Sequence, residues 1–286
     1  MSRLAYLATF VVWLGHLEAV SGAPPQEYRF TYRPLAVGDA AHETLRFTID
    51  LKTVRSQGGE VVDVNDQAAV REEQSLVVRL DPDPGQSAKV RLTYEQSQQS
   101  TQPRSGTVQS SDRPVAGKTY LAARQGEDLL IADERGLAPP DEEREIVART
   151  LESLGKPNPL GVFFNGRSMR VGERVQLPAD YTQKLLAAWD PAFSKEPLEV
   201  MLMGTERVDG QLCALLHTPP AAAGGRRNPV EGKFLIELAT CRPAVVELRG
   251  PVNSSEQRGE PGQEFDVRRK GKLQVAVHVE HRRAAR

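Results

Sequence analysis

Apolar and polar residues alternate along three long segments of this chain. In the first segment, 43–54, the alternating apolar residues are Leu45, Phe47, Ile49 and Leu51. A β-strand turns successive side chains to opposite faces, so this pattern predicts a strand with one buried face and one wet face. Such strands are typical of antiparallel sheets, because strands of parallel sheets are covered on both faces. The same alternation recurs over 88–95 and 273–280.

Shorter alternating segments fill much of the remaining chain. Asp209-Gly210 lies between two of them, and Asp-Gly in that position is a strong hairpin signal. Gly58-Gly59 and Lys270-Gly271 predict two further reversals. Segment 81–85 predicts a loop, because its prolines cannot donate to a sheet ladder. The shorter candidate strands are 75–80, 119–123, 129–133, 198–208, 211–217, 233–238, 244–248 and 264–269.

One helix is well specified by the sequence. Asp141 and the acidic residues after it suit the positive N-terminal end of a helix. Apolar residues follow at helical spacing as far as Leu151 and Leu154, and Gly155 then provides a stop. We therefore predict a helix over 141–154, with its apolar stripe packed against the sheet.

A second, weaker helix and two loops complete the local predictions. The helix is expected over 179–188, where Tyr181 would face inward. Segment 96–113 is rich in Gln, Ser and Thr, and segment 219–229 is rich in Ala, Gly and Pro. Because both bury few apolar side chains, we predict that they are mobile loops.

These elements predict a mainly β protein, built as an antiparallel curved sheet, an open barrel or two related β-halves. Val37-Gly38-Asp39 and Val171-Gly172-Glu173 share a short pattern, and alternating strands follow each. An internal duplication would divide the mature chain into an N-terminal β-half, 23–157, and a C-terminal β-half, 158–286. The alternative is one continuous domain in which the shared pattern is coincidental.

The first twenty-two residues have the parts of a secretory signal peptide. Arg3 gives a positive start, 4–17 is largely apolar, and small residues including Gly22 follow. The apolar run is shorter than the about 20 residues that span a bilayer. We therefore expect cleavage after Gly22, export to the periplasm or the extracellular space, and a mature chain without an integral membrane segment. The alternative is a retained membrane anchor.

Charge and cysteine content narrow the classes of function. The 286 residues carry 37 basic and 38 acidic side chains, and the leader contains one of each, so the formal charge of the mature chain stays at −1. We expect no nucleic-acid partner, because a near-neutral protein lacks the basic footprint that nucleic acid requires. An oxidising compartment would favour a Cys213–Cys241 disulfide, worth roughly 3–4 kcal/mol. Two buried free thiols are the alternative.

No catalytic signature stands out in the sequence. HExxH, GxSxG and glycine-rich phosphate loops are all missing. His278 and His281 are three residues apart on a predicted strand and would point to opposite faces, so we expect neither a metal site nor a cofactor. A catalytic triad dispersed through the sequence keeps a secreted hydrolase as the alternative function.

The candidate ligand-binding residues lie in and after the predicted helix. Phe163 and Phe164 are adjacent aromatic residues that would mark the mouth of an apolar pocket, or else belong to the core. Leu151 and Leu154 would line such a pocket from the helix, and Tyr181 would line it from the second helix. We therefore predict that these five residues contact an apolar ligand.

The layout of the chain resembles uncharacterised secreted β-sheet proteins of bacterial envelopes. The matching residues are Val37-Gly38-Asp39 and Val171-Gly172-Glu173. In architecture, the layout is more distantly similar to periplasmic lipoprotein carriers, whose unclosed barrel holds acyl chains under helical lids. The resemblance covers most of 27–282 and implies no functional residue for this chain. The lack of a lipoprotein cysteine near the expected cleavage site indicates a protein without a lipid anchor.

Three kinds of function follow from these patterns. The leading hypothesis is an exported non-catalytic protein that either binds an apolar or amphiphilic ligand or contacts an envelope protein. A ligand carrier predicts an apolar cavity beneath the helix. An interaction module predicts a filled core with an exposed apolar patch or sheet edge. A hydrolase predicts a cleft where a histidine meets a carboxylate.

Overall fold

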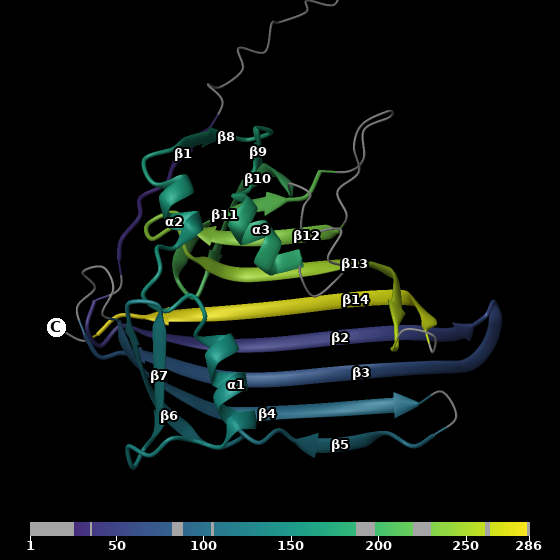
Figure 1. Cartoon of the computed structure of the whole chain (residues 1–286). Helices are drawn as coiled ribbons and strands as arrows, with labels where there is room; N and C mark the ends of the chain where they lie inside the picture. Colours follow the sequence, from purple (N-terminus) through teal and green to yellow (C-terminus); the bar gives the residue numbers. More distant parts are fainter. Residues whose placement is uncertain are drawn as a thin grey trace, which may run out of the picture.

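A computed structural model of the chain describes residues 26–34, 36–81, 88–103, 106–186, 198–219, 230–260 and 264–284. Figure 1 shows a broad sheet with the helices on one of its faces. The expected signal peptide, 1–22, lies outside the described residues, as does nearly all of the predicted loop 219–229.

One large antiparallel sheet dominates the fold. The path of strands begins at β7 and ends at β9, and these two strands do not pair, so the described sheet stays open. β5 (Gln109–Asp112) pairs with β4, and β1 (Glu27–Arg29) pairs with β8 (Ser168–Arg170) in a separate small sheet. In spatial order the strands of the path are β7 (Asp128–Asp133), β6 (Thr119–Gln125), β4 (Lys89–Pro103), β3 (Glu60–Arg79), β2 (Ala40–Gln57), β14 (Phe265–Arg282), β13 (Pro243–Arg258), β12 (Glu231–Glu237), β11 (Gln211–His217), β10 (Glu199–Val208) and β9 (Arg174–Gln176).

The predicted fold class is confirmed. The sheet is curved and open, its strands are antiparallel, and the alternation in 43–54 and 273–280 corresponds to β2 and β14. These two strands pair without a break from Ala40↔Arg282 to Ser56↔Asp266. The pairing sets Phe47 opposite Val275, so the apolar rows of both strands share one face. Asp209-Gly210 and Gly58-Gly59 form the predicted hairpin turns.

The predicted reversal at Lys270-Gly271 is wrong, because β14 runs straight through both residues. Gly271 pairs with Leu51 of β2, and a Cβ atom added there would lie 1.8 Å from the Asp50 carbonyl oxygen. Glycine therefore allows a close approach of two strands, one of the uses of glycine within a sheet. A single glycine in a polar stretch gives no sequence signal that separates this use from a turn.

The predicted mobile loop over 96–113 is also wrong in large part. Most of this segment forms the outer half of β4 and the short strand β5. β4 pairs with β3 as far as Gln67↔Pro103 and with β5 from Gln98↔Asp112 to Thr101↔Gln109. Backbone hydrogen bonds hold these residues in the sheet although their side chains bury little. Composition therefore misses this part, because it reports side-chain burial and not ladder pairing.

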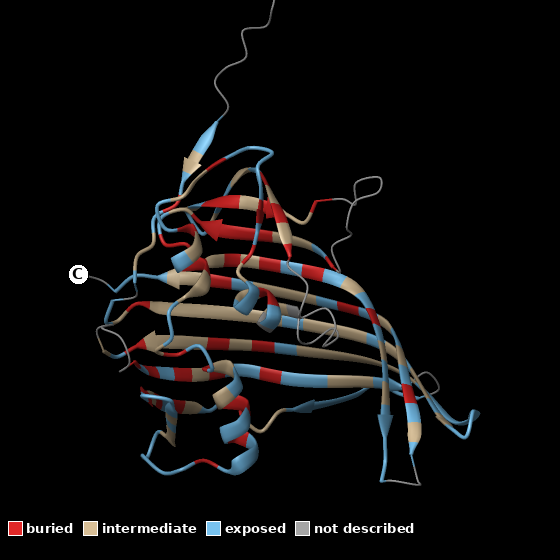
Figure 2. Ribbon diagram, turned by 45° about the horizontal axis from the view of Figure 1, so that its top comes forward, coloured by how far each residue is buried: buried red, intermediate tan, exposed pale blue. Residues whose placement is uncertain are grey.

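Two hydrophobic cores lie on the helix-bearing face, and a small third one lies on the outer face. Figure 2 shows the buried residues gathered near the helices, whereas the far ends of the long strands are mostly exposed. The larger core joins β10–β14 to α2 and includes Phe164, Phe234 and Leu248. The second core joins β4 and β6 to α1 and includes Leu92 and Val147.

Helix α1 (Asp141–Thr150) is fixed to the sheet at both ends by polar contacts. Near its N-terminus, Glu143 accepts hydrogen bonds from Tyr120 Oη at 2.6 Å and from Lys118 Nζ at 2.7 Å. At its C-terminus, Tyr94 Oη lies 2.7 Å from Thr150 Oγ1. The predicted helix continued to 154, but residues 151–155 form turns that end at Gly155 with φ +71°.

The other two helices lie over the opposite end of the same face. Helix α2 (Pro159–Phe164) was not predicted, because six residues are too few to show a helical period. Its start is nevertheless encoded locally, since Asn158 Oδ1 accepts from Leu160 N at 3.1 Å and proline occupies the first turn. Helix α3 (Ala179–Leu186) confirms the second predicted helix, whose last two residues lie outside the described residues.

The predicted division into 23–157 and 158–286 falls between α1 and α2. Strands from both sides of this boundary belong to one sheet, in which β2 and β14 are neighbours. The duplication itself stays a prediction.

The contact between Tyr120 and Glu143 generates a first prediction. We expect Tyr120→Phe to lower the free energy of unfolding by about 2 kcal/mol, the scale of a hydrogen bond to a charged group. Burial alone would raise the pKa of Glu143, but hydrogen bonds from Lys118 and Tyr120 outweigh it, so the net pKa lies below its ordinary value of 4.5. Urea unfolding of wild type and variant provides the measurement.

The pH dependence of this difference supplies the control. A lowered carboxyl pKa contributes stability that is present above pH 4.5 and is lost as the pH falls through the lowered value. The deficit of Tyr120→Phe should therefore shrink in acid. An equal deficit at neutral and acidic pH would contradict the role given to ionised Glu143.

Candidate functional site

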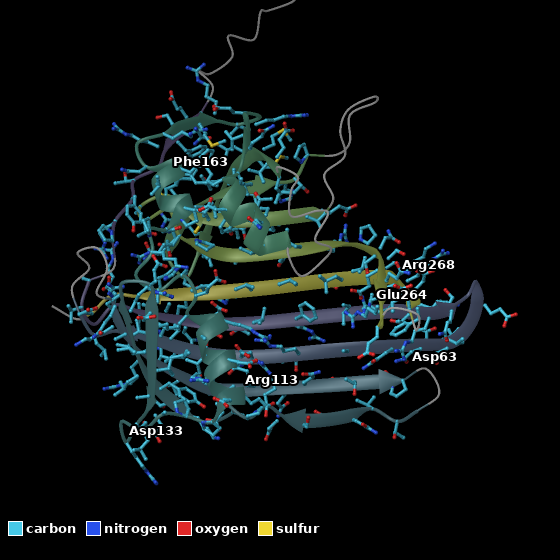
Figure 3. The ribbon with its side chains drawn as sticks, in the orientation of Figure 1. Asp63, Arg113, Asp133, Phe163, Glu264 and Arg268 are labelled. Atoms are coloured by element: carbon cyan, nitrogen blue, oxygen red, sulfur yellow. The ribbon has the colours of Figure 1, made fainter. Side chains whose placement is uncertain are left out.

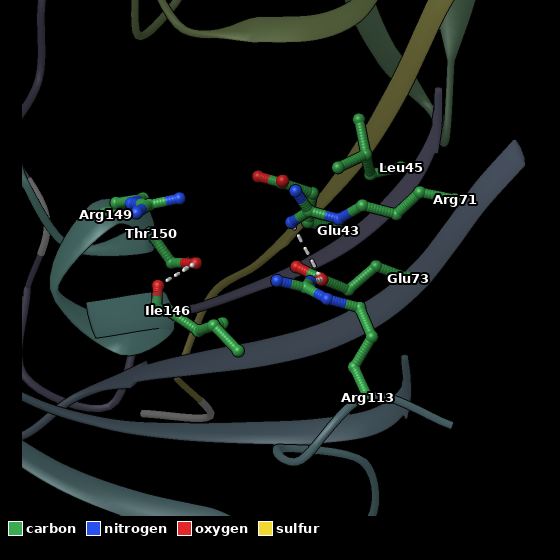
Figure 4. A pocket seen from close by; sticks show the side chains of 8 residues that line it. All are labelled: Glu43, Leu45, Arg71, Glu73, Arg113, Ile146, Arg149 and Thr150. Carbon is green, nitrogen blue, oxygen red and sulfur yellow. Dashed lines mark hydrogen bonds and ion pairs between the residues drawn. The ribbon is translucent and has the colours of Figure 1, made fainter. Parts of the chain in front are cut away.

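A cavity of about 290 Å³ lies between helix α1 and the middle of the sheet. Figure 4 shows the charged side chains of Glu43, Arg71, Glu73 and Arg113 converging on it from the sheet, while α1 faces them from across the cavity. Its size is close to the lower end of ordinary ligand pockets, which begin at about 300 Å³. The lining residues are Glu43, Leu45, Arg71, Glu73, Arg113, Ile146, Arg149 and Thr150.

The register of three strands brings the charged residues together. Glu43 and Leu45 share the inner face of β2, and Leu45 pairs with Glu73 of β3. Arg71 lies two residues before Glu73 and shares its face. Glu73 pairs in turn with Ser97 of β4, whose carbonyl accepts from Arg113 N at 2.8 Å. Four segments distant in sequence therefore meet at one place.

Glu73 is the centre of the hydrogen bonding in this site. Its side chain is 4% exposed, and its Oε2 accepts from Arg113 Nη1 at 2.6 Å, Arg71 Nη2 at 2.9 Å and Ser97 Oγ at 3.1 Å. Two guanidinium groups thus neutralise a carboxylate that water hardly reaches. A buried charge is tolerated only when it is paired and hydrogen-bonded in this way.

Glu43 occupies a different position in the same cavity. Burial raises the pKa of Glu43, the nearby charge of Glu73 raises it further, and Arg71 acts in the opposite direction. Among the described residues, no hydrogen bond or ion pair joins the Glu43 side chain to a partner. Its carboxyl group is therefore available to a ligand and favours the neutral form more than an exposed glutamate does.

Burial also affects the other polar groups of this site. Burial and the neighbouring Arg71 lower the pKa of Arg113, although Glu73 partly compensates for this. Burial raises the pKa of Tyr94 to about 12, which keeps its hydroxyl protonated. Thr150 donates to the Ile146 carbonyl at 3.2 Å, so the proton between Tyr94 and Thr150 comes from Tyr94.

An apolar row continues from the cavity along the inner face. Leu45 lines the cavity, and Phe47, Ile49 and Leu51 follow it at every second position of β2. These three side chains and Val275 and Val277 of β14 pack against the larger core, yet all of them stay partly exposed. The middle of the inner face is therefore apolar without being fully covered.

The structure separates the five ligand-binding residues predicted from the sequence. Leu151 and Leu154 are buried in the second core. Phe164 is fully buried in the larger core, where it stacks on Phe30 with ring centroids 4.6 Å apart. Phe163 and Tyr181 are partly buried against that larger core. Figure 3 shows Phe163 at α2, on the other side of β14 and β2 from Arg113.

The predicted Cys213–Cys241 disulfide is absent from the structure. Both cysteines are free and buried. Cys241 lies in the larger core, whereas Cys213 lies in the third core with Leu235 and Ala244. Burial raises the pKa of each thiol to about 11, so neither is a reactive thiolate.

Two histidines meet carboxylates, but on the outer face of the sheet. His42 Nε2 lies 2.9 Å from Glu95 Oε2, and His278 Nε2 lies 3.0 Å from Asp209 Oδ2. The members of the second pair are 48% and 40% exposed. No histidine lines the cavity between α1 and the sheet.

The described part of the chain holds no group of three or more His, Cys, Asp and Glu side chains arranged to ligate a metal ion. None of its helices combines the length and the apolar character needed to cross a bilayer.

The sequence contains a partial signal for this cavity. Glu43 has the same parity as the apolar residues of its strand, which places a carboxyl group on the buried face. The Arg71–Glu73 spacing likewise places opposite charges on one face of β3. The bulge between Gln74 and Ser75 and the return of the chain to Arg113 depend on tertiary structure, so they could not be inferred from pattern alone.

No family model and no curated protein matches the chain. Among solved structures, it is similar to a putative outer membrane lipoprotein-sorting protein domain from Vibrio parahaemolyticus, with 10% identity, 84% of this chain and 87% of that chain covered, and a TM-score of 0.19. It is also similar to a LolA superfamily protein from Nitrosomonas europaea, with 8% identity, 84% and 87% covered, and a TM-score of 0.17. A third is a β-barrel-like protein of a domain of unknown function from Brucella abortus, with 13% identity, 85% and 99% covered, and a TM-score of 0.16.

The first two of these structures are named for the carrier group to which the sequence layout was compared. All three TM-scores are below 0.2, so these likenesses assign no function to this chain.

The raised pKa of Glu43 leads to a second prediction. A raised carboxyl pKa means that the folded state holds its proton more tightly than the unfolded state does. Stability should therefore fall as the pH rises from about 4.5 through the raised value, and Glu43→Gln should remove this loss. We expect the variant to be more stable than wild type at neutral pH and equally stable in acid.

Chemical unfolding at several pH values measures this effect. Glu72→Gln is the matched control, because Glu72 lies next to Glu73 on β3 with 55% of its side chain exposed on the outer face. A stability gain of Glu43→Gln that is independent of pH would show that packing, and not ionisation, is responsible.

Proposed function

We propose that this protein is an exported, non-catalytic binder of an amphiphilic ligand, which it holds on the helix-bearing face of its open sheet. The supporting observation is the partly exposed apolar row that continues from the charged cavity along β2 and β14. A row of this kind would receive an apolar chain, and a charged cavity at its end would receive a polar group. The export part of this proposal is based on residues 1–22, whose sequence resembles a secretory signal peptide.

The residues predicted from the sequence have a place in this proposal. Phe163 and Tyr181 lie partly exposed at the larger core and would extend the apolar surface for a long ligand. Leu151, Leu154 and Phe164 are buried and would support this surface from beneath. The ligand region proposed here therefore runs from α1 towards α2 and α3, and not beneath α1 alone.

A second candidate function is contact with a second copy of this chain through the sheet edge at β7. A cavity of about 300 Å³ lies at this edge, and among its lining residues Leu121 is 37% and Leu130 is 50% exposed. Exposed apolar side chains on an edge strand are a known route to strand pairing between chains. Sedimentation velocity of wild type and of Leu130→Glu, each at several protein concentrations, tests this candidate. If the two proteins have the same sedimentation coefficient at every concentration, the candidate fails.

The amphiphile proposal generates a third prediction, on ligand binding. Ile49→Glu places a charge in the apolar row, and we expect it to weaken binding of dodecyl maltoside at least about tenfold, since each 1.4 kcal/mol is worth that factor. Thr48→Glu is the matched control, because the adjacent residue points to the outer face of the same strand. Displacement of an apolar fluorescent dye measures the affinity.

Two further measurements complete this test. Native mass spectrometry of wild type, purified without detergent from an exporting host, should reveal a bound apolar molecule that Ile49→Glu lacks. A cooperative thermal transition in both variants would show that they are folded, and Ile49→Gln serves if the charged variant is not. Equal dye binding by Ile49→Glu, Thr48→Glu and wild type would refute the proposed function.

A further inference from the structure

The cavity beneath α1 contains guanidinium donors that its own carboxylates leave unused. Arg113 directs Nη1 to Glu73 and Ser97, and Arg71 directs Nη2 to Glu73. Arg71 Nε is shielded from solvent and has no hydrogen-bond partner among the described residues. Each guanidinium carries five N–H groups, so both arginines keep donors for a further acceptor. A buried donor without a partner is costly, and an acceptor on a ligand would offset that cost.

The charge of the lining also favours an anion. Arg71, Arg113 and Arg149 supply three positive charges, whereas Glu43 and Glu73 supply at most two negative charges. Burial raises the pKa of Glu43, so its carboxyl group takes up a proton next to an incoming anion more easily than an exposed glutamate does. A neutral Glu43 would donate a hydrogen bond to the anion instead of repelling it.

The apolar wall of the cavity restricts the ligand further. Leu45 and Ile146 line the same space as the arginines, and Leu45 starts the partly exposed row of β2. A small inorganic anion would leave this wall unused, whereas an amphiphile would cover both parts. The geometry couples the arginines and the apolar row at one site.

We propose that the cavity beneath α1 binds the anionic headgroup, carboxylate or phosphate, of an amphiphile whose apolar chain lies along β2 and β14. This inference rests on the proposed function and names the class of its ligand. Arg71 and Arg113 are held in place by Glu73 and bind the headgroup oxygens through their free N–H groups. Arg149, whose side chain is 81% exposed on α1, contributes charge at the entrance.

The first experiment compares ligands that share one chain and differ in headgroup. The full mature chain is titrated calorimetrically with dodecanoate, dodecyl phosphate, dodecyl maltoside and dodecyltrimethylammonium, all below their micelle concentrations. We expect the two anionic amphiphiles to bind about tenfold more tightly than the maltoside, from charge-assisted hydrogen bonds. The cationic amphiphile should bind more weakly than the maltoside.

Titration with acetate and inorganic phosphate separates a lipid headgroup from a free anion. If the cavity takes an amphiphile, both small anions should bind far more weakly than their dodecyl counterparts, because they leave the apolar row uncovered. Small anions that bind as tightly as the dodecyl compounds would overturn the proposal in favour of a free-anion site.

The second experiment tests the arginines. Arg71→Gln should weaken binding of dodecyl phosphate about tenfold and weaken binding of dodecyl maltoside by a smaller factor, because the uncharged headgroup loses no charge-assisted hydrogen bond. Arg46→Gln is its control, because Arg46 lies on the outer face of β2 with 64% of its side chain exposed. Arg113 and Ser97 still bond to Glu73 in Arg71→Gln, so we expect the variant to fold.

A surface variant keeps the test decisive even if Arg71→Gln is unstable. Arg149→Gln should produce a smaller loss of dodecyl phosphate affinity that disappears at high salt, whereas Arg144→Gln, on the same helix but outside the lining, should not. Glu43→Gln should strengthen binding of the anionic amphiphiles at neutral pH.

The outcomes separate a failure of the proposed function from a failure of the headgroup inference. If none of the dodecyl compounds binds, the proposed function fails. If all four bind with equal affinity, and Arg71→Gln and Arg149→Gln change nothing, the function stands and the anionic headgroup inference is refuted. Preference for the cationic amphiphile would refute it as well.

Discussion

The uninterrupted pairing of β2 with β14 is the constraint on which the rest of the structure depends. These strands come from opposite ends of the chain, and their ladder runs from Ala40↔Arg282 to Ser56↔Asp266. It joins the strands that carry α1 to the strands that carry α2 and α3, so that a single sheet forms. It also aligns the apolar rows of both strands on the inner face. Because the contact spans almost the whole sequence, forming it carries a high loop-closure cost and should limit the rate of folding.

The coverage of the inner face follows from where the helices are attached. Polar contacts fix α1 over β4 and β6, and apolar packing fixes α2 over the strands at the other end. The row along β2 and β14 lies between these two attachments and is only partly buried. An open sheet can leave its middle accessible in this way without giving up the two cores that stabilise it, whereas a closed barrel of this width would enclose the same surface.

The sequence predicted the elements whose apolar side chains are buried with the period of a strand or a helix, as in β2, β14 and α1. It was misleading for elements whose side chains do not show such a pattern. The outer half of β4 pairs through its backbone although its side chains are polar, and Gly271 lies within a strand where a turn was expected. The site depends on register, a bulge and the return of the chain to Arg113, which join residues far apart in sequence. The partial signals that the sequence contains are Glu43, a carboxylate in an otherwise apolar row, and the Arg71–Glu73 spacing on β3.

The charged residues of the cavity are difficult to explain as a means of stabilising the fold. Replacing buried ion pairs with well-packed apolar residues is often neutral or stabilising, so a buried carboxylate with two arginines is weak evidence of a structural role. A second acidic group, Glu43, adds like charge next to Glu73 and thereby disfavours its own ionised form. Apolar side chains at these positions would join the second core to the row on β2 and close the cavity. The chain instead keeps charged groups from several segments at the end of an accessible apolar row, where an amphiphile would satisfy both.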